Sequence, residues 1–202
     1  DIREGFGLKK FIGDKRVTGA ILSDSREINV DFVISGIGIS PNILMAKKAG
    51  VEIDNGIKTD KYGKTSVQNI WSAGDCASLL FEGRRIRLES VQNAIDQAEC
   101  VAENIMGNEK EYNPKPWFWS DQYETKLQIA GLNSGYNKIV TRIGKNTSIS
   151  YWYYKDDKLL AVDAMNDPRS YMVGKRLIEM GKSPKSISIE DTSLELKSLL
   201  KP

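Results

Sequence analysis

Apolar and polar residues alternate over short distances at the start of the chain. Residues 5–34 form short apolar runs separated by the turn-like stretches GDK (13–15) and SDSR (23–26), a pattern that predicts a small antiparallel meander. The run VDFVISGIG (30–38) is different because it is almost continuously apolar. Such a run is typical of a strand covered on both faces, so we expect a buried strand here.

The next elements are predicted from their boundary residues. Ser40 fits a helix N-cap, Pro41 the first helical position and Gly50 a left-handed stop, so a helix should follow the strand. The triplet DNG at 54–56 is a hairpin signal between two short strands. The stretch IWSA within 69–73 then predicts a short buried strand that ends on a glycine and a carboxylate.

The longest periodic segment lies in ESVQNAIDQAECVAENIMG. Its apolar residues recur at intervals of three and four, which predicts an amphipathic helix that begins near Glu89 and Ser90 and ends at Gly107. The apolar positions of this stripe are Val91, Ala94, Ile95, Ala98, Ala102, Ile105 and Met106.

The pattern of apolar and polar residues changes in residues 111–202. TKLQIAGL, NKIVTRI, TSISYWYY and KLLAVDAM predict four strands in sequence, DPRSYMVGKRLIEMG predicts a helix, and SLELKSLL predicts a short amphipathic one. Strands that follow one another directly usually pair antiparallel, so we expect a separate α+β unit.

Composition narrows the function classes. The 202 residues carry 29 basic and 27 acidic side chains, and a net charge of +2 argues against an extended nucleic-acid footprint. No apolar stretch approaches the roughly 18 residues of a membrane span, and no secretory signal pattern opens the chain, so a cytoplasmic protein is expected.

There is no histidine, which excludes Ser-His-Asp and Cys-His catalysis and His-ligated metal sites within this sequence. Cys76 and Cys100 lack metal-ligand spacing and are interpreted as small buried thiols. We therefore expect no metal site and no catalytic side chain; a bound cofactor is the expected carrier of chemistry.

A flavin site is the chemistry that the residues themselves suggest. Gly74 lets the backbone approach a ligand closely, and Asp75 can accept hydrogen bonds from ribityl hydroxyls. The helix start at Ser90 and Val91 offers unpaired N–H groups and a partial positive charge, which would favour reduced flavin by roughly 0.3 to 2 kcal/mol. The alternative for the Gly-Asp pair is an ordinary turn. GIG at 36–38 holds only part of a dinucleotide fingerprint, because Pro41 stands where its third glycine would be, and is interpreted as a packed turn.

PWFWSDQ places three large aromatic residues together after a proline. They are interpreted either as core or domain interface, or as a stacking surface beside a planar ring.

Five segments together resemble one family. VDFVISGIGISPN, IWSAGDCA, RLESVQNAIDQAECVAENIMG, PWFWSDQYETKLQIAGL and AVDAMNDPRSYMVGKRLI occur in the order found in ferredoxin and rubredoxin reductases of the putidaredoxin reductase type, within the pyridine nucleotide-disulfide oxidoreductase superfamily. The resemblance extends over essentially the whole chain.

The resemblance implies an FAD-dependent reductase that takes a hydride from NADH or NADPH and passes electrons to a ferredoxin or rubredoxin of an oxygenase system. It implies that Asp75 holds the FAD ribityl and pyrophosphate region and that Val91 gives its backbone N–H to the flavin pyrimidine. It also implies that Trp119 lies beside the isoalloxazine ring and faces the electron acceptor.

The resemblance also implies the fold class and the domains. A partial Rossmann-like α/β part precedes a C-terminal antiparallel sheet domain with helices: 1–42 as a remnant of the NAD-binding domain, 43–110 as the second FAD-binding segment and 111–202 as the reductase C-terminal domain. Both complete nucleotide fingerprints of the family lie upstream of VDFVISGIG and are not in this sequence. We therefore expect a carboxyl-terminal half that by itself binds FAD weakly or not at all. We expect its residues 1–110 to be mobile, self-associated or rearranged.

A non-enzymatic alternative is a partner-docking module, as in flavoproteins related to apoptosis-inducing factor. Lys175, Arg176 and Lys182 would then face an acidic partner, against the simpler interpretation of a solvated helix face.

Overall fold

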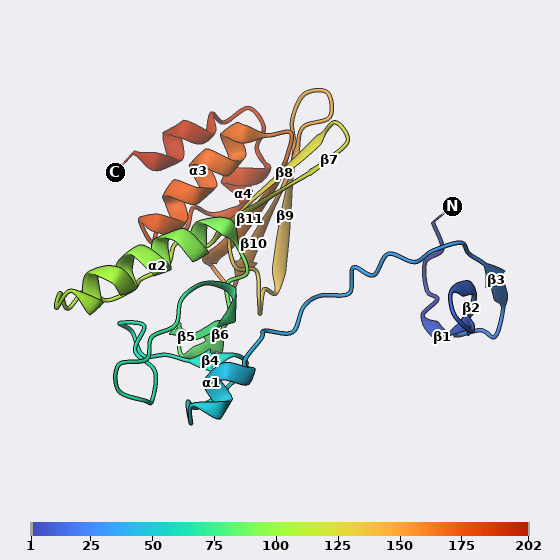
Figure 1. Ribbon diagram of the computed structural model, residues 1–202. Helices are drawn as coiled ribbons and strands as arrows, with labels where there is room; N and C mark the ends of the chain where they lie inside the picture. Colours follow the sequence, from blue (N-terminus) through green and yellow to red (C-terminus); the bar gives the residue numbers. More distant parts are fainter. Residues whose placement is uncertain (1, 202) are drawn as a thin grey trace. The chain divides into compact units, whose positions relative to one another are not determined.

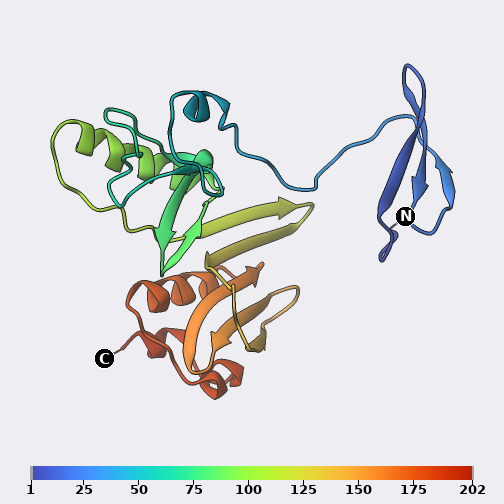
Figure 2. The ribbon, with the colours of Figure 1, turned by 90° about the horizontal axis from the view of Figure 1, so that it is seen from below.

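The computed structural model describes residues 2–201 and divides into two compact units, one up to Ser40 and one from Pro41 onward (Figures 1 and 2). The first unit is a three-stranded antiparallel sheet in the order β1 (Leu8–Gly13), β2 (Val17–Leu22) and β3 (Glu27–Asn29). The predicted meander is confirmed.

The strand predicted at 30–38 is wrong. Its residues lie in no strand, and Phe32, Ile34 and Ile37 are 72%, 85% and 94% exposed. A continuous apolar run forms a central strand only where neighbours pair with its backbone and cover both faces. Within its own unit only Val30 of this run donates to a strand backbone, at the carbonyl of Thr18, so the run forms no strand.

The second unit begins with a shorter helix than predicted. Helix α1 spans Leu44–Lys48 with Ile43 as its N-cap, so the assignment of Ser40 and Pro41 to the helix start is wrong. The glycine stop is confirmed, because Gly50 has φ +78° and its N–H donates to the carbonyl of Lys47 at 3.1 Å. None of the α1 residues is buried, so packing does little to lengthen this helix beyond a short turn.

A small sheet follows, in the order β4 (Ile57–Lys58), β5 (Ala77–Phe81) and β6 (Arg84–Ile86). The predicted turn at 54–56 is confirmed by an antiparallel bridge between Ile53 and Ile57. The strand predicted at 69–73 is wrong: this stretch makes one isolated bridge, and β5 starts only after the 3₁₀ turn η1 (Gly74–Cys76). A strand needs a ladder of partners, and a single bridge does not supply one. The Gly-Asp pair therefore precedes a strand instead of ending one.

Helix α2 spans Val91–Ile105, as its boundary residues predict. The Ser90 hydroxyl accepts a hydrogen bond from the Asn93 N–H at 3.1 Å, which caps the first turn. Gly107 adopts φ +98° just beyond the last turn.

The carboxyl-terminal part contains a five-stranded antiparallel sheet (Figure 1). Its strands are β7 (Trp117–Gln122), β8 (Thr125–Gly131), β9 (Lys138–Ile143), β10 (Ile149–Lys155) and β11 (Lys158–Met165). The four predicted strands are confirmed, and PWFWSDQ supplies a fifth that the sequence reading did not assign. Their order is β7-β8-β11-β10-β9, so the sheet is not built of sequential neighbours throughout: the last strand lies between β8 and β10.

Helices α3 (Pro168–Glu179), α4 (Ser186–Glu190) and the 3₁₀ turn η2 (Leu196–Leu200) pack on one face of this sheet. The helix predicted from DPRSYMVGKRLIEMG is confirmed, with Asp167 as its N-cap and Pro168 in its first turn. The core between the layers centres on Trp152 and Tyr154, which are 0% and 1% exposed. Its other buried members are Val140, Leu159, Val162, Val173, Leu177, Ile189 and Leu196.

Candidate functional site

The Gly74–Asp75 turn lies directly against helix α2. The Gly74 N–H donates to the Gln97 side-chain oxygen at 2.8 Å, and a Cβ placed on Gly74 would lie 3.5 Å from the Cβ of Ala94. Gly74 also has φ +77°, a conformation that side chains with a Cβ disfavour. The turn and the helix therefore form one local structure, as the flavin hypothesis requires.

The first turn of α2 retains unpaired donors. Ser90 occupies the N–H of Asn93, whereas the N–H groups of Val91 and Gln92 reach no acceptor among the described residues. These groups carry the positive end of the helix dipole. They can bind a carbonyl or an anionic oxygen.

Arg87 joins the turn to the helix entrance. Its guanidinium donates to the Asp75 carbonyl oxygen at 3.1 Å and lies 2.5 Å from the Glu89 carboxylate. Its Nε atom is buried and has no acceptor in the described part of the chain. The Asp75 side chain is exposed. Open N–H donors beside an exposed carboxylate fit a ligand that carries both acceptor oxygens and hydroxyl donors, as the flavin and ribityl parts of FAD do.

Of the two tryptophans of β7, Trp117 is the one that lies at the start of α2. A small cavity at the start of α2 is lined by Ser90, Gln92 and Trp117, among others, and not by Asp75, Val91 or Trp119. The Trp119 ring lies 5.5 Å from the Trp117 ring, tilted by 31°, and is 44% exposed. The structure thus brings Gly74, Asp75, Ser90 and Val91 together by way of α2. It places Trp119 one ring further along β7.

The sequence predicted Trp119 as the indole of the site and did not single out Trp117, which lies nearest the start of α2. The available signal was the strand period: residues 117 and 119 lie on one face of β7, with Phe118 on the other. Tyr171 of α3 packs against Trp117, with 6.4 Å between the ring centres, and helps to hold that indole in place.

Buried hydroxyl and thiol groups near α2 are structural. The Tyr112 hydroxyl donates to the Asn93 side-chain oxygen at 2.8 Å, and burial raises the Tyr112 pKa, so this group stays protonated. Burial also raises the pKa of the Cys100 thiol, which disfavours a nucleophilic thiolate. Cys76, at the turn, is half-buried, and both cysteines are free.

The basic residues of the docking alternative are mostly engaged within the chain. Lys175 lies 2.5 Å from the Glu179 carboxylate, and Lys182 donates to the Lys201 carbonyl at 3.2 Å. Arg176 lies near the end of α3. Within residues 2–201, no helix is long and apolar enough to span a membrane.

Two family models match the chain. Residues 1–98 match the pyridine nucleotide-disulphide oxidoreductase family, and residues 117–200 match the reductase C-terminal family. Among curated proteins, rhodocoxin reductase of Rhodococcus erythropolis is 40% identical over 189 residues, which cover 91% of this chain and 44% of that protein. Putidaredoxin reductase CamA of Pseudomonas putida is 36% identical over 207 residues, covering 99% of this chain and 49% of the relative.

Solved structures agree with these matches. The ferredoxin reductase for the CYP199A2 system of Rhodopseudomonas palustris superposes with a TM-score of 0.91 at 37% identity, covering 98% of this chain and 50% of that one. The reductase in the covalent putidaredoxin reductase–putidaredoxin complex gives a TM-score of 0.91 at 35% identity, with 99% and 49% coverage. The chain spans about half the length of the curated relatives that it matches.

Proposed function

This chain belongs to the pyridine nucleotide-disulphide oxidoreductases of the ferredoxin reductase type, and we propose that it serves as the carboxyl-terminal part of an FAD-dependent NAD(P)H reductase that passes electrons to a ferredoxin or rubredoxin. The observation that carries the proposal is the Gly74–Asp75 turn held against the open N-terminus of α2. Bound FAD would accept a hydride and release single electrons, chemistry that no side chain of this sequence supplies.

The chain's own residues would bind and orient the cofactor. Asp75 would accept hydrogen bonds from ribityl hydroxyls, and the Val91 N–H would donate to the flavin pyrimidine oxygen. Ser90 keeps the helix start rigid by capping Asn93. Trp119, with Trp117 behind it, would shield the isoalloxazine ring and face the electron acceptor.

The proposal assigns each part of the chain to a domain of the reductase. Residues 1–42 would belong to the NAD-binding domain, 43–110 to the FAD-binding domain and 111–202 to the reductase C-terminal domain. The reductase would work in the cytoplasm beside its iron–sulfur partner. The 202-residue chain by itself should bind FAD weakly, because it supplies acceptors and donors only for one part of the cofactor.

Removing the Asp75 carboxylate should weaken FAD binding. In the reductase holoenzyme that contains this chain, we expect Asp75→Ala to raise the FAD dissociation constant roughly 10- to 100-fold, the effect of losing a hydrogen bond to a charged group. Flavin fluorescence during titration of the deflavinated enzyme measures it. Glu99→Ala, which removes an exposed carboxylate from the middle of α2, is the matched control and should bind FAD like the wild type. Equal retention of FAD by the two variants would refute the assigned role of Asp75.

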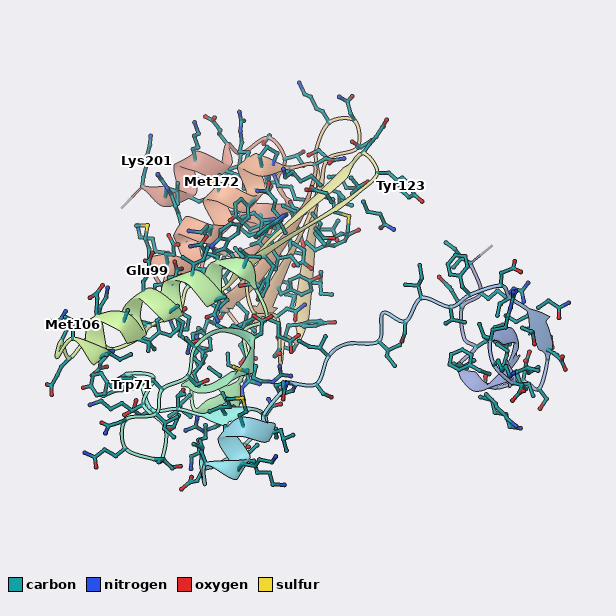
Figure 3. All side chains as sticks on the ribbon, viewed as in Figure 1. Trp71, Glu99, Met106, Tyr123, Met172 and Lys201 are labelled. Atoms are coloured by element: carbon teal, nitrogen blue, oxygen red, sulfur yellow. The ribbon has the colours of Figure 1, made fainter. Side chains whose placement is uncertain are left out.

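Truncating Trp119 should slow electron transfer from the reduced flavin to the ferredoxin and leave flavin reduction by NADH unchanged. We expect Trp119→Ala to slow reduction of a ferredoxin about tenfold while flavin reduction by NADH keeps its rate, because an exposed aromatic anchor is lost at the partner side. Stopped-flow absorbance separates the two steps. Tyr123→Ala truncates the exposed tyrosine at the tip of the same hairpin (Figure 3) and should leave both rates unchanged. A reductase that reduced only disulfide substrates would rule out the proposed function altogether.

A further inference from the structure

Helix α2 turns amide side chains toward the rest of its unit. Its buried residues are Asn93, Gln97, Cys100, Val101 and Asn104, and three of these five carry an amide. A helix on a protein surface normally buries an apolar stripe, and a buried amide is costly unless its hydrogen bonds are satisfied. The two amides nearest the helix start obtain their partners from the segments around the candidate flavin site.

Gln97 holds the Gly74–Asp75 turn. Its side chain is 1% exposed, and its oxygen accepts from the buried Gly74 N–H at 2.8 Å. A backbone N–H can only donate, so Gln97 must present its oxygen, and not its NH₂ group, to the turn. The next residue is Asp75, so the Gln97 side chain fixes where this carboxylate lies relative to α2.

Asn93 fixes the orientation of the Gln97 amide. The Asn93 NH₂ group donates to the Leu88 carbonyl at 3.0 Å and to the Gln97 oxygen at 3.5 Å. Its own oxygen therefore faces Tyr112, whose hydroxyl donates to it at 2.8 Å. Because the Leu88 carbonyl can only accept and the Gly74 N–H can only donate, every hydrogen bond between them has one possible direction. The network has a single satisfied arrangement.

This network joins two parts of the candidate site. Asn93 lies in the first turn of α2, where its own N–H is capped by the Ser90 hydroxyl at 3.1 Å. Gln97 follows four residues later, so both side chains project from the same face of the helix. The amide pair thereby links the turn that carries Asp75 to the helix start that carries the Val91 N–H.

We propose that Gln97 is a positioning residue of the flavin site, which holds the Asp75 carboxylate in place relative to the Val91 N–H. Asn93 supports it by keeping the Gln97 oxygen turned toward the Gly74 N–H. The inference rests on the proposed flavin function, and in it Gln97 acts through the turn without touching the cofactor. Because the positive end of α2 favours reduced flavin, a displaced turn should weaken binding of reduced FAD more than that of oxidised FAD.

Gln97→Met in the reductase holoenzyme that contains this chain tests the role. Methionine keeps the length of the side chain but offers the Gly74 N–H only a weak acceptor. We expect the dissociation constant to rise about tenfold for oxidised FAD and about a hundredfold for reduced FAD. The tenfold difference between the two forms corresponds to a fall of about 30 mV in the two-electron potential. Flavin fluorescence titration measures the affinity, and a reductive titration with a reference dye measures the potential.

Asn104→Leu is the matched control because it removes another buried amide from the same helix. The Asn104 side chain pairs with the backbone of Tyr62 and Lys110, and it lies seven residues, or about 10 Å, beyond Gln97. We expect this variant to unfold at a lower temperature but to keep the flavin potential of the wild type. An equal fall in potential in both variants would reduce the role of Gln97 to helix stability and overturn the inference.

A double-mutant cycle with Asp75→Ala separates this inference from the proposed function. If Gln97 acts through the turn, Gln97→Met should weaken FAD binding less than about threefold once the Asp75 carboxylate is absent. Full additivity would overturn the inference. If Asp75→Ala bound FAD like the wild type, the assigned role of Asp75 and this inference would both fail. Weak binding by Asp75→Ala, together with wild-type affinity and potential in Gln97→Met, would overturn the inference alone.

Tyr112→Phe is a milder change to the same network, since it removes one hydroxyl and retains the ring. It leaves the Asn93 oxygen without its donor. We expect the dissociation constant of oxidised FAD to rise about threefold and the potential to fall, as in Gln97→Met. A wild-type potential in Tyr112→Phe would overturn the inference even if Gln97→Met yielded no folded enzyme.

Discussion

Replacement of Arg142 by alanine is expected to lower the free energy of unfolding by about 3 kcal/mol. The guanidinium of Arg142 donates to the carbonyls of Ile189, Asp191, Thr192 and Leu194 at 2.8, 2.7, 3.4 and 2.9 Å. It thereby connects strand β9 to α4 and to the loop between α4 and η2. Alanine would remove the Arg142 donors from two partly buried carbonyls, those of Ile189 and Leu194. Urea unfolding followed by intrinsic tryptophan fluorescence, to which the buried Trp152 contributes, measures the loss.

Arg169→Ala is the control for this prediction. Its guanidinium is exposed and lies 3.9 Å from the Glu195 carboxylate, so its loss should change the free energy of unfolding by less than about 1 kcal/mol. If the two arginine variants were equally stable, the carbonyl contacts of Arg142 would contribute nothing beyond ordinary surface charge.

Gly131→Ala should destabilise the chain by at least about 3 kcal/mol, because backbone strain and overpacking act at the same position. Gly131 ends strand β8 with φ +80°, and a Cβ there would lie 2.1 Å from the carbonyl oxygen of Leu160 on β11. The clash is with the backbone of a central strand and cannot be relieved by a rotamer change. Thermal unfolding compared with wild type gives the size of the effect.

The loop glycine Gly135 separates the two causes. It has φ +86° and open space around its Cβ position, so Gly135→Ala costs only the left-handed conformation, about 1–2 kcal/mol. Similar losses in both variants would mean that β8 and β11 can move apart at Gly131.

Elements with strong local boundaries were predictable from the sequence. The capping serine and the terminal glycine located α2, and strand alternation located β8 to β11. The segments 30–38 and 69–73 misled because apolar continuity indicates that a segment prefers burial without showing what will pair with it. The orientation of α2 could not be predicted for a related reason, since its buried Gln97 and Asn104 side chains pair with the backbone of Gly74 and Tyr62, which lie far away in the sequence.

The residues of the candidate site also differ in whether the sequence could predict their positions. The glycine turn and the helix start could be found from residue chemistry, and the structure places them in contact. Trp119 came from the family resemblance, and only the cavity at the start of α2, which Trp117 lines and Trp119 does not, shows that Trp117 is the ring nearer to α2.

The position of β11 between β8 and β10 has a consequence for synthesis on the ribosome. Strands β8 and β10 leave the exit tunnel before the strand that pairs with both of them, so the nascent chain carries two unsatisfied inner edges until Met165 has emerged. Cotranslational closure of this sheet must wait for that last strand, and a ribosome that stalls earlier would hold a chain open to wrong partners.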